Sequence, residues 1–498
     1  MNIELSSLQN GSDIRGVALA TPNGAPVSLT EDIANQIAIA FVHYIAGKTG
    51  KACGDLKIGV GHDSRVTAPS LKKAVLAGVL AAGAQAFDCA MASTPAMFCA
   101  TVYPETGFDG SVMITASHLP MERNGLKLFD RDGGFDKPDI KAVLAAAGRI
   151  VPVYGDRAAR PFDLIALYSK DLREKIKRGV SAADYAHPLA GLHVVLDAGN
   201  GAGGFFAEQV LKPLGADISG SQFLEPDGAF PNHVPNPENK AAMASIRAAT
   251  VRHNADLGII FDTDVDRMSA VLPNGEEVNR DAIIAMMAAV LSPDYPGATI
   301  VTDSVTSDRL TAFLEGTLDL RHHRFKRGYK NVINEAIRLN KEGVVCPLAI
   351  ETSGHGALSE NYFLDDGAYM AVKLLVAAAR AKAQGRRLGA LIEALPPAFE
   401  EKEARIPISG ADFAGTGQAV LGAFEARAAQ AGYTVAPNSY EGVRLTFPEG
   451  WVLLRLSLHD PLLPLNVEGN GPGDCQTLLT RVAALLQGFD ALDLSVLQ

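Results

Sequence analysis

Short apolar runs alternate with Ala- and Leu-rich segments along most of the chain. Runs rich in β-branched residues predict buried strands at Lys57–Asp63, Ser111–Ser117, His193–Asn200, Asp256–Asp262 and Ala298–Asp303. The segments between them predict helices, for example at Ser70–Ala84, Ala241–Ala249 and Asp281–Leu291. This alternation is typical of βα units, so we expect α/β domains with mostly parallel sheets and polar sites where the strands end.

The alternation is organised in successive blocks along the chain. One block runs to about Val151, and a second contains the strands before the turn Pro273-Asn274-Gly275. A third ends in a predicted helix at Ala368–Gln384, and alternating strands on an α+β module follow it. A length of 498 residues suggests roughly three domains at ~150 residues each, but four blocks fit the pattern better. We therefore expect domains at residues 1–152, 153–273, 274–386 and 387–498.

Composition narrows the class of protein. With 47% hydrophobic residues the chain can form sizeable cores, and its net charge of −11 disfavours nucleic acid or an anionic membrane as a general partner. Five scattered cysteines without a CxxC pair argue against a disulfide scaffold or a cysteine zinc site. The first residues show no apolar signal-peptide core, and the apolar stretch Ala74–Ala84 is too short for the ~20 residues that span a bilayer. We expect a cytoplasmic protein with no membrane contact.

A serine follows the predicted strand that ends near residue 117. The segment Thr115-Ala116-Ser117-His118-Leu119-Pro120 is followed by Asn124-Gly125-Leu126-Lys127. A serine on such a loop is exposed to ligands, and a neighbouring His, Lys or metal can activate it as a nucleophile. A plain Ser/Thr turn beside a solvated histidine is the alternative, whereas the absence of GxSxG argues against an α/β-hydrolase.

Three carboxylates follow the apolar run Leu257–Phe261. Asp262, Asp264 and Asp266 alternate along Asp262-Thr263-Asp264-Val265-Asp266-Arg267. Unpaired, they would repel one another, but together they can bind one hard cation such as Mg²⁺. Their spacing does not fit an EF-hand, whose twelfth position would be Pro273. A solvated acidic turn is the alternative.

Three later segments carry polar groups suited to a phosphorylated sugar. Lys326-Arg327-Gly328-Tyr329 offers basic donors on a Gly-containing loop, and Glu351-Thr352-Ser353-Gly354-His355 offers groups that bind hydroxyls. Arg455 and Ser457, two residues apart on a strand, can hold a phosphate. Each of these segments is also compatible with an ordinary surface or a half-buried strand.

In this order, the segments resemble the α-D-phosphohexomutase superfamily, which includes phosphomannomutase/phosphoglucomutase and phosphoglucosamine mutase. Further matching motifs are Ser12-Asp13-Ile14-Arg15-Gly16, Gly61-His62-Asp63-Ser64-Arg65, Leu196–Gly204 and Phe230–Glu238. The resemblance covers nearly the whole chain. It implies three tandem mixed α/β domains and a C-terminal α+β domain around a central cleft, in a heart-shaped molecule.

The resemblance also implies a reaction. A phosphohexomutase interconverts hexose 1-phosphate and hexose 6-phosphate through an active-site phosphoserine and a hexose 1,6-bisphosphate, which also serves as activator. The partner is then a small phosphosugar, and the protein is a monomer or dimer. The most similar activity is that of phosphomannomutase/phosphoglucomutase. Phosphoryl transfer depends on positioning and charge neutralisation, which a metal and several cations supply.

The resemblance assigns roles to residues of this chain. Ser117 would carry the phosphoryl group and, with Asp262, Asp264 and Asp266, hold one Mg²⁺ per chain. His118 and Lys127 would serve proton transfer, and Arg15 and Arg267 would face the transferring phosphoryl group. The expected sugar-binding residues are Glu351, Ser353, Lys326 and Tyr329. The expected phosphate-binding residues are Arg455, Ser457 and His459.

The chain departs from the family pattern at several positions. Thr263 and Val265 replace glycines of the acidic loop, and Tyr329 replaces a common histidine. In the C-terminal loop His459-Asp460-Pro461 replaces Thr-Glu-Pro, and Pro464 replaces a second arginine. The non-reacting phosphate is therefore expected to be bound differently.

Alternative functions follow from the same segments. Phosphoglucosamine mutase is the nearest, although Gly11-Ser12-Asp13-Ile14 matches the opening motif of that enzyme only in part. A haloacid-dehalogenase-type phosphatase would use Asp262 as nucleophile and Asp264 as acid, with Leu364-Asp365-Asp366-Gly367 as its second acidic pair, but it leaves Ser117 and Arg455 without a role. A sugar-phosphate-binding relative without turnover would account for the altered phosphate loop.

Overall fold

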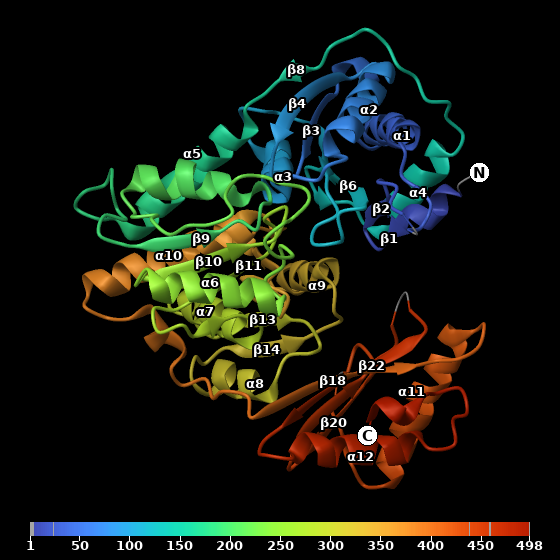
Figure 1. Cartoon of the computed structure of the whole chain (residues 1–498), viewed down its shortest axis with the longest axis vertical. Helices are drawn as coiled ribbons and strands as arrows, with labels where there is room; N and C mark the ends of the chain where they lie inside the picture. The colour runs from blue at the N-terminus through green and yellow to red at the C-terminus, as the bar shows by residue number, and fades with distance from the viewer. Residues whose placement is uncertain (1–3, 23, 438, 458–459, 498) are drawn as a thin grey trace. The chain divides into compact units, whose positions relative to one another are not determined.

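The computed structural model describes residues 4–22, 24–437, 439–457 and 460–497. Figure 1 labels the helices and strands of the chain, which divides into two compact units by its internal contacts. The first unit contains the chain up to Val290 together with Ser353–Leu391, and the second contains Leu291–Thr352 and the chain from Ile392 onward. The domain boundaries at 152, 273 and 386 remain predictions.

The first unit begins with a large mixed sheet. Its strands are β1 (Gln9–Asn10), β2 (Asp13–Val17), β3 (Lys57–His62), β4 (Gln85–Met91), β5 (Gly110–Ile114), β6 (Arg123–Asp130), β7 (Gly133–Gly134) and β8 (Arg160–Pro161). They lie in the order β1-β2-β6-β5-β3-β4-β8, with β7 beside β6. Strands β5, β3, β4 and β8 run parallel, whereas β6 pairs antiparallel with both β5 and β2.

Helices cover this sheet. They are α1 (Glu31–Thr49), α2 (Ala68–Ala81), α3 (Thr94–Val102) and α4 (Lys137–Ala147). Helices α1, α2 and α4 share one apolar core with the sheet, in which Phe41, Val75 and Ile140 are fully buried. Helix α3 packs against β5 and β6, and it begins where the Ser93 side chain accepts a hydrogen bond from Ala96 N–H. This cap fixes the position of Thr94, the first residue of the helix.

A second, smaller sheet completes the first unit. Its strands are β9 (Val194–Asp197), β10 (Leu257–Phe261), β11 (Met268–Val271) and β12 (Glu277–Val278), in the order β12-β11-β10-β9. Helices α6 (Lys240–Arg252) and α10 (Gly367–Ala383) pack against it, α5 (Leu164–Val180) packs against α10, and α7 (Asp281–Leu291) follows β12 in the chain. Only β9 and β10 run parallel, and β10 joins its antiparallel neighbour β11 through the acidic loop. The short strands β16 (Gly356–Leu358) and β17 (Leu364–Asp365) form an antiparallel pair in the same unit.

The second unit contains two different sheets. In the first, β13 (Thr299–Thr302) lies between the parallel strands β14 (Arg321–Arg324) and β15 (Leu348–Ile350), next to α8 (Asp308–Gly316) and α9 (Tyr329–Lys341). The other sheet is wholly antiparallel, in the order β18-β22-β21-β20-β19. Its strands are β18 (Glu400–Pro407), β19 (Thr434–Val435), β20 (Val443–Phe447), β21 (Gly450–Leu454) and β22 (Leu462–Gly469). Helices α11 (Phe413–Gln430) and α12 (Asp474–Leu486) share its apolar core.

The structure confirms the α/β class and corrects one detail. Every strand and helix predicted above is present, with ends shifted by a few residues. The expectation of mostly parallel sheets is wrong for the first unit, whose two sheets are mixed. The apolar runs resemble parallel strands because β5, β6, β10 and β11 are almost entirely buried, although their pairings with one another are antiparallel.

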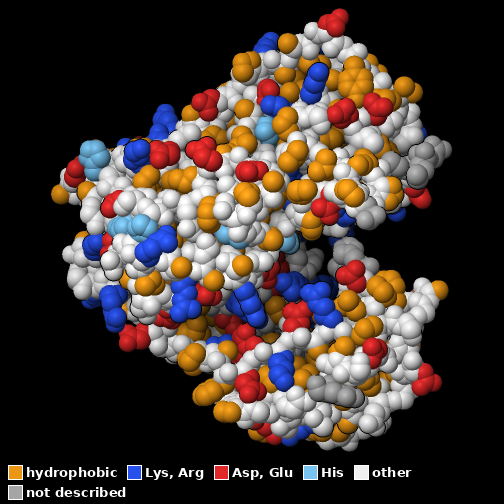
Figure 2. Space-filling model, in the orientation of Figure 1, with side chains coloured by type: hydrophobic (Ala, Val, Ile, Leu, Met, Phe, Trp, Pro, Cys, Tyr) orange, Lys and Arg blue, Asp and Glu red, His pale blue; other side chains and the backbone are white. Residues whose placement is uncertain are grey.

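On the face drawn in Figure 2, Lys and Arg side chains are interspersed with Asp and Glu over both units. None of the helices in the described part of the chain is both long and apolar enough to cross a bilayer.

Candidate functional site

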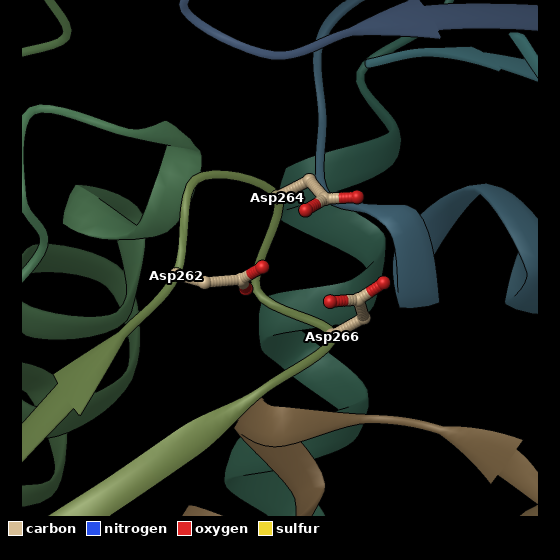
Figure 3. A group of neighbouring side chains, drawn as sticks. All are labelled: Asp262, Asp264 and Asp266. Carbon is tan, nitrogen blue, oxygen red and sulfur yellow. The ribbon is translucent and has the colours of Figure 1, made fainter. Parts of the chain in front are cut away.

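The loop between β10 and β11 brings three aspartates together. Asp262, Asp264 and Asp266 face one another across this loop (Figure 3), and all three are buried. One carboxylate oxygen from each lies within 4.8 Å of the others. Val265 turns the loop with a φ of +68°, in the left-handed region that β-branched residues rarely adopt. The three carboxylates therefore form a single anionic cluster.

Crowding of negative charge dominates the electrostatics of this cluster. Burial raises the pKa of Asp262 well above its ordinary value, and the charges of Asp266 and Asp264 add to that effect. Burial also acts on Asp266, but attraction to Lys127 and other cations outweighs it and holds the pKa of Asp266 well below its usual range. Asp264 Oδ1 is buried and accepts no hydrogen bond from the described residues. An orphaned carboxylate oxygen within such a cluster fits a hard divalent cation.

Two cations, one on a strand and one on the acidic loop itself, balance part of this charge. Lys127, on β6, donates from Nζ to Asp264 Oδ2 at 3.1 Å and to Asp266 Oδ2. Arg267, at the end of the acidic loop, donates from Nε to Asp262 Oδ2 at 3.2 Å. Both side chains are buried. Two positive charges against three carboxylates leave the cluster formally negative, which again favours an added cation.

Ser117 lies at the centre of these charges. It follows β5, and its Oγ donates to Asp262 Oδ2 at 3.0 Å. The same oxygen accepts a hydrogen bond from Arg267 NH2 at 2.9 Å and lies 3.3 Å from His118 Nδ1. Its backbone is left-handed, with a φ of +51°. The serine predicted from the sequence is therefore in direct contact with the predicted acidic loop.

His118 and Arg15 complete the predicted set in the first unit. The pKa of His118 falls to about 2, because burial and the positive charges of Arg267 and Arg15 disfavour the imidazolium. Arg267 also donates from NH2 to His118 Nδ1, which is consistent with a neutral ring. Arg15 lies on β2 opposite Gly125 and forms an ion pair with Asp13 at 2.7 Å.

The structure adds residues that the sequence reasoning missed. Thr94, the first residue of α3, donates from Oγ1 to Asp264 Oδ2, and its N–H donates to the Asp264 carbonyl at 2.9 Å. His355 Nε2 lies 3.6 Å from Asp266 Oδ1, and Ser353 Oγ lies 3.1 Å from His355 Nδ1. The motif that contains Ser353 could have indicated His355, since only Gly354 separates the two. Thr94 carries no such signal, because its contact depends on where α3 packs.

In the second unit, the two predicted sugar-binding segments meet. Glu351 follows β15, and its Oε1 accepts a hydrogen bond from Gly328 N–H at 2.6 Å. Gly328 has a φ of +112° and precedes Tyr329, where α9 begins. Lys326, two residues before Gly328, is exposed. Glu351 thus lies beside the basic loop, as expected for one polar site.

The predicted phosphate-binding arginine is held by side chains that the sequence did not indicate. Arg455, which is 7% exposed, donates from NH1 to Glu441 Oε1 and from NH2 to Asn466 Oδ1, both at 3.2 Å. Glu441 Oε2 also accepts hydrogen bonds from Ser304 Oγ at 2.7 Å and from Arg327 N–H at 2.9 Å. Glu441 therefore links Arg455 to the basic loop.

The remaining residues of the predicted phosphate loop are described only in part. Ser457 Oγ accepts a hydrogen bond from Asp460 N–H at 3.1 Å. His459 lies outside the described residues.

The fold and the first-unit cluster define a class of protein. An α/β chain that places a serine hydroxyl among buried carboxylates, an arginine and a lysine is equipped to transfer a phosphoryl group, because positioning and charge neutralisation carry that chemistry. The cluster combines an oxygen nucleophile with groups that can hold both a cation and a phosphate.

Comparison with known proteins agrees with this class. Sequence models of the phosphoglucomutase/phosphomannomutase family match residues 6–149 (alpha/beta/alpha domain I), 167–275 (domain II) and 279–399 (domain III). A phosphomannomutase/phosphoglucomutase of Pseudomonas aeruginosa is 29% identical over 488 residues, which cover 98% of this chain and 96% of the relative.

Solved structures give the same result. A phosphoglucomutase/phosphomannomutase family protein of Burkholderia thailandensis superposes with a TM-score of 0.77 at 26% identity, covering 97% of this chain and 96% of that one. The Aspergillus fumigatus N-acetylphosphoglucosamine mutase, solved with GlcNAc-6P and magnesium, shares the fold at a TM-score of 0.54 and 14% identity, covering 79% of this chain and 92% of that one. The chain belongs to the α-D-phosphohexomutase superfamily and is an isomerase of the phosphotransferase type. The resemblance derived from the sequence is confirmed.

Proposed function

We propose that this chain interconverts hexose 1-phosphate and hexose 6-phosphate through phosphorylated Ser117 and a hexose 1,6-bisphosphate. The activity most similar to it is that of phosphomannomutase/phosphoglucomutase. The observation that carries the proposal is the position of Ser117 Oγ, 3.0 Å from Asp262 Oδ2 and 2.9 Å from Arg267 NH2. The bisphosphate is also the proposed activator, because it can phosphorylate a Ser117 that has lost its phosphoryl group.

One Mg²⁺ per chain fits the acidic loop. Asp262, Asp264 and Asp266 would hold it together with phosphorylated Ser117, and the orphaned Asp264 Oδ1 supports this ligand set. When bound, the ion neutralises charge on the phosphoryl group. The magnesium in the Aspergillus relative agrees with this assignment.

The residues of the chain supply the remaining parts of the reaction. Arg267 and Arg15 orient the phosphoryl oxygens, since a guanidinium can bind two oxygens at once. A sugar hydroxyl takes the phosphoryl group from Ser117 Oγ; its proton passes to a neighbouring base, and Ser117 is left as the alkoxide that regains a proton. Lys127 and His118 are the proposed proton carriers, with His355 as a third candidate because it also reaches Asp266.

The specificity residues belong to the same proposal. Glu351, Ser353, Lys326 and Tyr329 would bind the sugar, and Arg455, Ser457 and His459 the non-reacting phosphate. The hydrogen bond from Gly328 N–H to Glu351 supports a shared role for Glu351 and the basic loop of the second unit. The cytoplasmic location and the monomer or dimer state remain predictions.

The decisive experiment measures mutase activity on mannose, glucose and glucosamine 1-phosphates with Mg²⁺ and catalytic bisphosphate. We expect turnover of at least the mannose or glucose ester and a loss of more than about 10³-fold in Ser117→Ala. Ser169→Ala, which removes another buried serine hydroxyl, is the matched control and should stay within about two-fold of wild type. Turnover of glucosamine 1-phosphate alone would favour phosphoglucosamine mutase. Wild-type activity in Ser117→Ala would overturn the mechanism.

A chemical test separates serine from aspartate as the phosphoryl carrier. In the phosphatase alternative, Asp365 and Asp366 would form the second acidic pair, but Asp366 is occupied by hydrogen bonds from Tyr168 Oη and Asn361 Nδ2, at 2.6 and 3.0 Å. We expect the labelled phosphoenzyme to survive hydroxylamine, as a phosphoserine does and an aspartyl phosphate does not. Label at Asp262 would support the phosphatase instead.

A further inference from the structure

Ser117 occupies a backbone conformation that must be held in place. A φ of +51° is unfavourable for a residue with a Cβ, because the Cβ then lies too close to a carbonyl oxygen. Ser117 leads into an irregular segment up to Arg123, where β6 begins. Carbonyl groups in such a segment need partners other than a strand neighbour.

Arg65 supplies these partners for much of the segment. Its NH1 donates to the carbonyl oxygens of Pro120 and Arg123, both at 2.9 Å. Its NH2 donates to the carbonyl oxygens of Ser117 and of Leu119, the latter at 2.6 Å. All four terminal N–H groups of one guanidinium therefore bind backbone between residues 117 and 123.

The guanidinium itself is fixed from two sides. Asp63 Oδ1 accepts a hydrogen bond from Arg65 N–H at 2.9 Å, and Asp63 Oδ2 lies 3.4 Å from Arg65 Nε. The ring of Phe230 lies over the guanidinium, 5.5 Å from its centre. Asp63 N–H in turn donates to the Ile114 carbonyl, at the end of the strand that leads to Ser117.

The burial of the Arg65 guanidinium suggests that its hydrogen bonds serve a function. Arg65 is 1% exposed, and a buried guanidinium destabilises the fold unless its partners are well placed. Here the partners are mainly carbonyls of the segment that presents Ser117. Lysine could not replace it, because an ammonium has only three donors and no planar fork.

We propose that Arg65 is a positioning residue that holds segment 117–123 in the shape that presents Ser117 Oγ to Asp262 and Arg267. It acts through backbone carbonyls and contacts neither substrate nor metal. This inference rests on the proposed role of Ser117 as phosphoryl carrier.

The first test compares Arg65→Lys with Arg427→Lys. Arg427 also donates to two backbone carbonyls, those of Leu485 and Gln487, but in the second unit. With rates normalised to folded protein, we expect kcat to fall about 10- to 100-fold in Arg65→Lys while KM stays within about three-fold, since small displacements of a reacting group cost that much. Amide hydrogen exchange should accelerate at residues 117–123. Arg427→Lys should change neither quantity.

The proposal is overturned if Arg65→Lys keeps kcat within about two-fold of wild type, or loses activity while exchange in segment 117–123 stays unchanged. A second variant, Thr115→Val, keeps Arg65 and removes the hydrogen bond from Ser117 N–H to Thr115 Oγ1, which is 2.9 Å long. Arg65 should then still protect residues 119–123 from exchange, and faster exchange there would also overturn the proposal.

The two proposals fail in different ways. Amide hydrogen exchange at residues 117–123 can be measured in Ser117→Ala protein, which needs no catalysis. It therefore tests whether Arg65 stabilises this segment even if Ser117 carries no phosphoryl group. Wild-type activity in Ser117→Ala would end the proposed mechanism and leave the exchange result standing.

Discussion

The acidic loop of the first unit and Arg455 of the second unit are both buried, but their charges are balanced differently. In the first unit, two cations face three carboxylates, and Asp264 Oδ1 is left without a hydrogen bond among the described residues. In the second unit, Arg455 has a carboxylate partner in Glu441 and an amide partner in Asn466. The first site is short of positive charge, whereas the second already contains an internal anion.

This difference distinguishes two kinds of ligand binding. A site with excess negative charge gains free energy when a cation enters, because like charges at short range repel. A site whose arginine is already paired gains less from an anion, which must displace or share the existing partner. We therefore expect the first unit to depend on a bound metal and the second to bind phosphate in competition with Glu441.

The largest effect is expected from Asp264→Asn. Losing one carboxylate should lower kcat/KM by about 10³-fold, because charge neutralisation by a bound cation contributes several kcal/mol. Mn²⁺ affinity, measured by electron paramagnetic resonance, should fall in parallel. Asp319→Asn, at an exposed aspartate of the second unit, is the control and should alter neither. Unchanged Mn²⁺ affinity in Asp264→Asn would refute the contrast in charge balance.

An intermediate effect is expected at the arginine of the second unit. Arg455→Ala should raise KM about 10- to 100-fold and change kcat little, since it removes charge-assisted hydrogen bonds to a non-reacting phosphate. Glu441→Gln should lower KM by about two- to five-fold, the range for a partly exposed ion pair. Steady-state kinetics with the preferred 1-phosphate measure both.

The matched control for that pair is Arg405→Ala, at an exposed arginine on β18. A rise of KM in Glu441→Gln similar to that in Arg455→Ala would mean that Glu441 helps to bind the substrate and does not compete with it.

The smallest effect is expected from the ion pair between His233 and Asp197 in the first unit, which depends on pH near neutrality. His233 Nε2 lies 3.0 Å from Asp197 Oδ2. His233 stands three residues before Asn236 in the chain, and Asn236 Oδ1 accepts a hydrogen bond from Arg267 NH1. Burial alone would lower the pKa of His233, but its hydrogen bond and attraction to Asp197 outweigh burial and raise it. The pair should therefore contribute fully below the unfolded pKa of about 6.5 and lose its contribution as pH rises through the higher folded value.

Urea unfolding at several pH values tests this pair. Wild type should lose about 1 kcal/mol of unfolding free energy relative to His233→Gln as pH rises through that window. His187→Gln removes a similar pair with Asp184 that is more than half exposed, and it should behave as wild type. Parallel pH profiles for wild type and His233→Gln would show that the histidine is not charged in the folded protein.

The sequence predicted most of the fold and the core of the site. Apolar runs located the strands, and motifs just after them contained Ser117, Asp262 and Arg267, because α/β folds place polar groups where strands end. The antiparallel pairing of β5 with β6 was not predictable, since burial on both faces removes the alternation that marks such strands. The roles of Thr94, Glu441 and Arg65 were not predicted from the sequence, for another reason. Their roles come from contacts across 50 or more residues of sequence, to which no local pattern points.

Val265, the left-handed residue of the acidic loop, lies close to two glycines that are far from it in the sequence, Gly203 and Gly367. Gly367 N–H donates to the Val265 carbonyl at 3.0 Å, and a Cβ on Gly367 would approach that oxygen to 2.9 Å. A Cβ on Gly203 would lie 3.4 Å from the Val265 side chain and 3.0 Å from the Phe261 ring. Larger residues at 203 and 367 should therefore be selected against whatever residue stands at 265, because the closest approaches are to the Phe261 ring and to backbone atoms of residues 265 and 267.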